Sequence, residues 1–153
     1  MKAQLGVRIL AAAAAASALA VLAPLAAADA VYHSQHMRLS PVGGAPLQSG
    51  FVENIKANGP TIYAHEVYVL NGASPNTTYT VFNNFFSRGD SECEGSADRF
   101  EMATLETNGS GNGRADALIA PFGLEVGVYG VRWTLEIGGD VVYQTDCSAV
   151  TID

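Results

Sequence analysis

Residues 128–137, Val-Tyr-Gly-Val-Arg-Trp-Thr-Leu-Glu-Ile, are the stretch that decides the fold class. Every second residue in it is large and apolar, namely Tyr129, Val131, Trp133, Leu135 and Ile137. Successive side chains of a β-strand point to opposite faces of the sheet. The stretch therefore predicts a strand whose apolar face lies in the core, with the intervening residues, from Val128 to Glu136, in water.

A tight turn at Gly138-Gly139-Asp140 is predicted to lead into a partner strand, because glycine reaches positive φ without steric cost. We prefer a three-residue loop, which pairs Leu135 with Tyr143 and Val131 with Cys147. This register puts Cys147 on the buried face, beside the tryptophan of the first strand.

The alternative is a two-residue loop. It would place Asp140 opposite Ile137 and turn the side chains of Val141 and Tyr143 to solvent. Only the three-residue loop buries the tyrosine.

The rest of the chain after residue 30 repeats this strand-and-turn pattern, with turn signals every 8–15 residues. Further strands are expected at 62–70, 77–86, 100–107 and 114–120, with one or two within 37–54 and a short one ending at Ile152. The glycine-rich tip 108–113 predicts a hairpin between strands 100–107 and 114–120. The pattern indicates an all-β fold, an antiparallel immunoglobulin-like β-sandwich of seven or eight strands.

One stretch carries a resemblance to a known family. Leu70-Asn-Gly72-Ala-Ser-Pro75-Asn-Thr77-Thr-Tyr79-Thr-Val81 is similar to the corner of fibronectin type III and related immunoglobulin-like sandwiches. The resemblance implies that the Tyr79 hydroxyl bonds back to the backbone of this corner. It also implies a likeness to bacterial secreted sandwich proteins, which suggests no particular activity.

The first 30 residues have the composition of a secretory signal peptide. Lys2 and Arg8 precede an uncharged apolar run from Ile9 to Leu25, and small residues follow. Cleavage is expected before Val31, or alternatively before Asp29. Residues 31–153 would then form one exported domain, in the periplasm, the cell envelope or the medium, without stable insertion in the membrane.

The charge of the exported domain excludes one class of partner. Lys2, Arg8 and Asp29 leave with the leader, so 8 basic and 15 acidic residues become 6 and 14, a net charge of −8. Such a surface repels nucleic acid, which needs clustered Lys and Arg. Cys93 and Cys147 are the only cysteines, and an oxidising compartment favours a disulfide between them.

Residues 90–101 form an acidic stretch with oxygen-bearing side chains at the spacing of a calcium loop. Glu92 and Glu94 are longer than the Asp or Asn that such a loop needs, and Cys93 would be tied down within it. A solvated acidic loop is the preferred interpretation. Weak calcium binding, or a small secreted hydrolase that uses this loop, is the alternative function.

Aromatic side chains offer the remaining candidate surface. Tyr63, Phe82, Phe85 and Phe86 could form an exposed patch, although core packing is the preferred interpretation. The sequence contains no nucleophile elbow and no cluster of metal-ligating histidines, and no cofactor is implied. We therefore expect a non-enzymatic binding or envelope-associated module for an extracytoplasmic protein or glycan.

Overall fold

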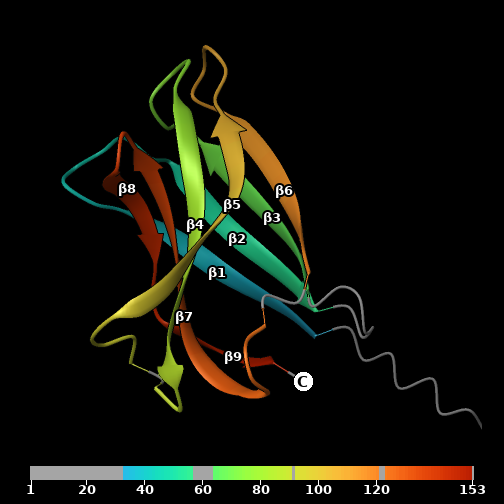
Figure 1. Ribbon diagram of the computed structural model, residues 1–153. Coiled ribbons are helices and arrows are strands. Elements are labelled where there is room, and N and C mark those ends of the chain that lie inside the picture. The colour runs from blue at the N-terminus through green and yellow to red at the C-terminus, as the bar shows by residue number, and fades with distance from the viewer. Residues whose placement is uncertain (1–32, 57–63, 91, 121–122, 153) are drawn as a thin grey trace, which may run out of the picture.

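The computed structural model describes residues 33–56, 64–90, 92–120 and 123–152, which form strands and turns without a helix (Figure 1). In these ranges there is consequently no helix with the length and apolarity needed to span a membrane. The predicted leader over 1–30 and Tyr63 lie outside these ranges. The nine strands are β1 (His33–Pro41), β2 (Ser49–Lys56), β3 (Ala64–Asn71), β4 (Thr78–Arg88), β5 (Ala97–Glu106), β6 (Gly113–Ile119), β7 (Gly127–Ile137), β8 (Asp140–Thr145) and β9 (Ser148–Ile152).

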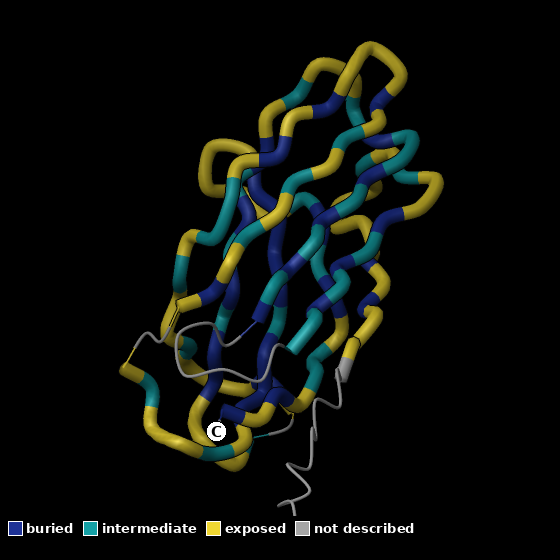
Figure 2. Tube along the Cα trace, turned by 90° about the vertical axis from the view of Figure 1, so that its right-hand side faces the viewer, coloured by how far each residue is buried: buried dark blue, intermediate teal, exposed yellow. Residues whose placement is uncertain are grey.

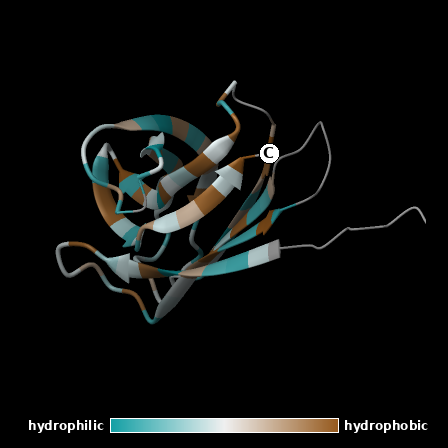
Figure 3. Cartoon of the chain, turned by 90° about the horizontal axis from the view of Figure 1, so that it is seen from below, coloured by the Kyte–Doolittle hydropathy of each residue, from teal (hydrophilic) through white to brown (hydrophobic). Residues whose placement is uncertain are grey.

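All of the strand pairs are antiparallel, and they form one continuous sheet in the order β5-β4-β7-β8-β1-β2-β3-β6, with β9 added beside β7. The sheet curls until its two edge strands approach each other, so it is nearly closed into a barrel (Figure 3). The predicted all-β antiparallel fold is confirmed. The described residues hold nine strands, one more than the upper predicted number of eight, although the two strands within 33–56 and the short strand that ends at Ile152 lie where strands were expected.

The predicted hairpin between strands 100–107 and 114–120 is wrong in its pairing. Both strands form, but β5 pairs with β4 and β6 pairs with β3. Only the bridge between Thr107 and Gly113 joins them directly. Beyond this bridge the two strands diverge, because β5 follows β4 and β6 follows β3.

β7 has the predicted apolar face at its centre. Tyr129, Val131, Trp133 and Leu135 are all buried, and they lie in one core with residues from β1, β2, β3, β4, β5, β8 and β9 (Figure 2). Ile137 is an exception, since it is 40% exposed beside the turn.

The opposite face of β7 was predicted to be wet, and this is wrong for Gly130, Thr134 and Glu136. All three are buried. Arg99 of β5 forms an ion pair with the Glu136 carboxylate and covers it. The two-residue period therefore told the two faces of β7 apart. It did not reveal that Arg99 of β5 covers the second face.

The β7–β8 turn combines the two predicted registers. Ile137 pairs with Asp140 across the two-residue loop that had been the alternative. The register then shifts between Leu135 and Glu136, so that Leu135 pairs with Tyr143 as preferred. A β-bulge thus restores the register that buries Tyr143.

The disulfide between Cys93 and Cys147 is present, with 5.6 Å between the two Cα atoms. Its predicted place beside Trp133 is wrong, because Val131 pairs with Ser148 and not with Cys147. Both sulfur atoms lie against Gly130 on the other face of β7. A Cβ at position 130 would be 3.2 Å from each of them. The chain leaves the β8 register at 146–147, which turns Cys147 away from the core.

The corner between β3 and β4 does not use Tyr79 as the resemblance implied. The Tyr79 ring is buried, but its hydroxyl has no hydrogen-bond partner. Thr107 holds the corner instead: its Oγ1 donates to the Ser74 carbonyl at 2.7 Å and accepts from the Thr77 N–H at 3.0 Å. Another tyrosine forms a bond of the expected kind, since Tyr129 donates to the backbone carbonyl of Glu125, four residues upstream, at 2.8 Å.

Candidate functional site

A groove opens between β1 and β9. The C-terminal part of β1 pairs with β8 over Leu39–Pro41, whereas His33–Arg38 pairs with β2 alone. β8 ends at Thr145, and β9 pairs with β7. The facing edges of β1 and β9 therefore form no ladder with each other within the described residues. The Gln35 side chain spans the gap, since its Nε2 donates to the Ala149 carbonyl at 3.1 Å.

The groove has a volume of about 340 Å³ and a wall of mixed polar and apolar character. Ligand pockets in proteins begin at about 300 Å³, so the groove has room for a few side chains or for a short stretch of extended chain. It is lined by Ser34, Gln35, Asn54, Lys56, Ala149, Val150 and Thr151.

A smaller and more apolar pocket lies next to the groove and shares Asn54, Lys56, Val150 and Thr151 with it. About 20 Å³ of this pocket is open to the centre of a water-sized group, which is enough for one such group. Its other lining residues are Ala64, Glu66, Phe85, Ile119, Val131, Trp133 and Ile152. It therefore has an apolar wall with a carboxyl group in it.

Glu66 is almost completely buried and is surrounded by hydrogen-bond donors. Its carboxyl group accepts from Tyr68 Oη at 2.5 Å, from Trp133 Nε1 at 2.8 Å and from Asn83 Nδ2 at 3.1 Å. The donors come from β3 itself, from β7 and from β4. These bonds are strong in a medium of low dielectric constant.

Burial raises the pKa of Glu66 to about 7, because loss of solvent penalises the carboxylate more than the three donors stabilise it. Burial and the nearby Glu66 carboxylate also raise the pKa of Tyr68. Glu66 therefore changes its charge near neutral pH in the interior of the protein. A perturbed carboxyl at a pocket is a recognised mark of a functional site.

Two buried amides beside Glu66 have unpaired oxygens. Asn54 lies directly opposite Glu66 in the β2–β3 ladder, and its Oδ1 has no hydrogen-bond partner. Asn83 Oδ1 is unpaired in the same way. An unpaired buried acceptor costs about 1–3 kcal/mol. Of the two, Asn54 lines the pocket, so its oxygen is the one that an entering hydrogen-bond donor could pair with.

The acidic stretch 90–101 does not form the arrangement that a calcium site needs. The described residues contain no group of three or more His, Cys, Asp or Glu that could hold a metal ion. The Asp90 carboxylate instead accepts from the backbone N–H groups of Glu92 and Glu94, at 2.8 and 3.1 Å. The stretch is capped by its own backbone, which favours the solvated-loop interpretation.

The aromatic candidates are covered. Phe85 and Phe86 are buried, as the core interpretation predicted, and the Arg99 guanidinium lies 3.6 Å above the Phe82 ring. Arg132 lies over Phe86 in a similar way, at 5.8 Å. These rings therefore do not form a flat apolar platform for a ligand.

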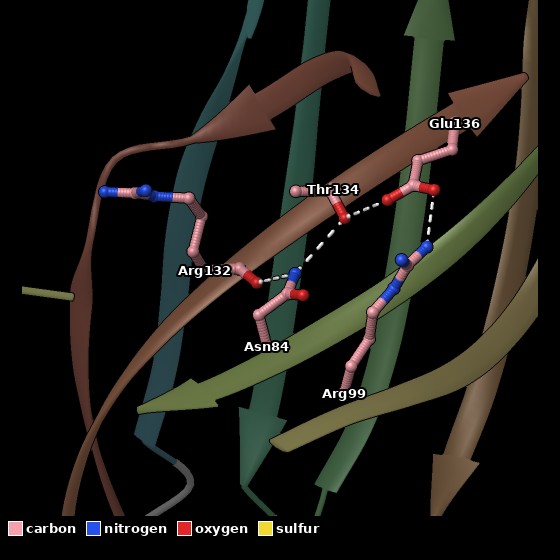
Figure 4. Close-up of polar contacts among 5 residues, drawn as sticks. All are labelled: Asn84, Arg99, Arg132, Thr134 and Glu136. Carbon is pink, nitrogen blue, oxygen red and sulfur yellow. Dashed lines mark hydrogen bonds and ion pairs between the residues drawn. The ribbon is translucent and has the colours of Figure 1, made fainter. Parts of the chain in front are cut away.

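A polar network covers the same outer face (Figure 4). Asn84 Nδ2 donates to the Arg132 carbonyl at 2.9 Å and to Thr134 Oγ1 at 3.2 Å. Thr134 donates to Glu136, which is paired with Arg99. Arg132 joins this chain of bonds through its carbonyl alone, and its buried Nε has no partner. The network accounts for the burial of Glu136.

Sequence reasoning missed Glu66, although a signal was present. In Ala64–Leu70 the buried positions alternate, and Glu66 takes one of them between Ala64 and Tyr68. A single carboxylate on an otherwise apolar face of a strand is a sign of a buried polar group. Trp133 was placed correctly in the core, but its bond to Glu66 joins two residues 67 positions apart.

The chain matches no family model, no curated protein and no solved structure.

Proposed function

We propose that this protein is an exported, non-enzymatic binding module of immunoglobulin-like architecture. In such a domain, strands A, B and E are neighbours in one sheet and strands C, F and G in the other. If β2 is strand A, the order β2-β3-β6 corresponds to A-B-E, and β4-β7-β8 corresponds to C-F-G. β5 is then an additional edge strand beside C, and β1 an additional strand beside A.

The tyrosine bond supports this assignment. Immunoglobulin-like domains have a tyrosine near the start of strand F whose hydroxyl bonds to the backbone a few residues upstream. Tyr129 has this position and this bond in β7, which is strand F of the assignment. The disulfide is compatible with an extracellular location.

The single observation that carries the binding function is the groove between the facing edges of β1 and β9. Unpaired strand edges bind extended peptide by adding a strand, so the groove favours a peptide segment of an extracytoplasmic protein. A glycan is the less favoured partner, because glycan sites use exposed aromatic faces and the described Phe82 and Phe86 rings are covered.

Selection from a displayed library of random linear peptides tests this proposal. The purified protein is expected to enrich peptides that the Ala149→Trp variant does not bind, since an indole at position 149 would fill the groove. Thr78→Trp is the matched control, because Thr78 is exposed at the start of β4 and does not line the groove. Equal binding by the Ala149→Trp variant, or no enrichment at all, would refute it.

A further inference from the structure

We propose that the pocket next to the groove accepts the ammonium group of a lysyl side chain from the peptide partner. This inference deepens the proposed function and rests on it for the access route. The pocket supplies the acceptors and the size limit, and the groove supplies a path for the methylene stem.

Two buried side chains supply the hydrogen-bond acceptors for the ammonium group. Asn54 is only 5% exposed, and its Oδ1 has no hydrogen-bond partner. It lines both the pocket and the groove. It lies opposite Glu66, whose contacts with Tyr68, Asn83 and Trp133 are all to neutral groups. An entering N–H donor with positive charge would pair with the first residue and compensate the charge of the second.

The size of the pocket selects among cations. The open space of about 20 Å³ admits one group of the size of a water molecule, which an ammonium group matches. A planar guanidinium is much larger. Val150, Ile152 and Trp133 supply an apolar wall for the methylenes that precede the charge. Lysine therefore fits better than arginine.

The other charged and titratable groups around the pocket are few. On β2 the pocket is lined by Lys56, and on β3 Tyr68 donates to Glu66. The lining residues from β4, β6, β7 and β9 are Phe85, Ile119, Val131, Trp133, Val150, Thr151 and Ile152, none of which titrates. Lys56 opposes a second cation and the Glu66 carboxylate attracts it, so ionisation of Glu66 should strengthen cation binding.

The side-chain analogue n-butylammonium tests the pocket without a peptide. Trp133 is the only tryptophan of the chain and lines the pocket, so its fluorescence and its indole N–H resonance report binding. We expect saturable changes with n-butylammonium, and affinities at least roughly tenfold weaker for n-butanol and n-butylguanidinium. No saturable change, or similar affinities for the amine and the alcohol, would overturn the inference.

Three variants and the pH make the test specific. Asn54→Ala should weaken n-butylammonium binding by roughly tenfold. Asn84→Ala, on the outer face, is the matched control and should leave it unchanged. Glu66→Gln should abolish the preference for the amine over the alcohol. Since Glu66 has a pKa of about 7, the affinity should rise about tenfold between about pH 6 and about pH 8.

The outcomes separate the two proposals. If n-butylammonium fails to bind while Ala149→Trp still blocks the selected peptides, only the lysyl pocket is wrong. If n-butylammonium binds but the Asn54→Ala variant binds it as tightly as the wild type, the amine binds elsewhere. The lysyl pocket is then wrong too. If the selected peptides bind and replacing their lysines by norleucine has no effect, the ammonium group is not what the partner supplies.

Discussion

At the scale of single residues, Glu66 is where the cost of burying a charge and the gain from hydrogen bonds are opposed. Its carboxyl group is held by three donors from three strands, yet burial still raises its pKa to about 7. The apolar surroundings thus outweigh the hydrogen bonds. The ionised form of Glu66 therefore destabilises the folded protein.

The pH dependence of stability follows from this residue. The folded state holds the Glu66 proton more tightly than the unfolded state, whose pKa is near 4.5. The stabilisation is therefore complete below about pH 4.5 and is lost as the pH rises through about 7. The difference in unfolding free energy between wild type and Glu66→Gln should fall by about 3 kcal/mol over this range. Urea unfolding at a series of pH values measures it, and a constant difference would contradict the prediction.

The two corner tyrosines should respond differently to loss of the hydroxyl. Tyr129→Phe removes a hydrogen bond to the Glu125 carbonyl and should cost about 1–2 kcal/mol of unfolding free energy. Tyr79→Phe removes a buried hydroxyl that has no partner, so it should cost no unfolding free energy and should raise it by up to about 1–3 kcal/mol. Thermal or urea unfolding of both variants compares them directly, and a larger loss for Tyr79→Phe would reverse the assignment.

The same pair of tyrosines shows what residue patterns could and could not predict. The spacing from Leu70 to Val81 matched a known corner, but spacing alone does not tell which strands a corner joins. Tyr129 had no such flanking pattern and was assigned only to the core. Its position relative to the strand order, which becomes visible only in the fold, is what gives it the corner role.

At the scale of strands and loops, the top of the molecule in Figure 1 is locked by two interlocking tips. The β3–β4 corner and the β5–β6 tip exchange backbone bonds: Ala73 N–H donates to the Gly111 carbonyl at 3.0 Å, and Asn76 N–H donates to the Asn108 carbonyl at 3.1 Å. This contact holds together the end at which β5 and β6 meet through a single bridge.

A pair of glycine variants tests this lock. Gly111 has φ +74°, and a Cβ there would lie 2.1 Å from the Ala73 carbonyl oxygen. Gly111→Ala should therefore cost about 2–4 kcal/mol and speed hydrogen exchange in the tips. Gly109→Ala, in the same tip, meets nothing closer than 3.9 Å and is the control. Equal stability of the two variants would show that the tips are not locked.

The strands themselves were largely predictable, whereas their partners were not. A two-residue period marks a strand such as β7 because one face must be apolar, and Tyr129 to Leu135 followed this rule. The period contains no information about which strand lies alongside. The β5–β6 hairpin therefore failed in its pairing, and the bulge beside Leu135 was not foreseen.

At the scale of the whole molecule, the disulfide joins the segment between β4 and β5 to the junction of β8 and β9. It connects residues 54 positions apart and lies against Gly130. Its pairing followed from the cysteine count, but its location could not, because the kink at 146–147 has no clear signal in the sequence. The groove was missed for the same reason, since it exists only because β9 leaves the line of β8.

Reduction of the disulfide should weaken the fold without changing its strand order. Opening a closed loop of 54 residues should cost about 4 kcal/mol, because the unfolded chain regains its freedom. Urea unfolding with and without a thiol reductant measures this loss, and the Cys93→Ser and Cys147→Ser double variant is the control for side reactions. No change in the midpoint would contradict it.

The position of this bridge also determines how the molecule would bear tension. If the chain were pulled from its two ends, β1 to β4 and β9 could be drawn out, but everything between the cysteines would be bypassed. That enclosed length corresponds to about 190 Å of extended chain, which would stay hidden until a reductant releases it. Single-molecule stretching should therefore show a contour length that grows by this amount when the bridge is cut.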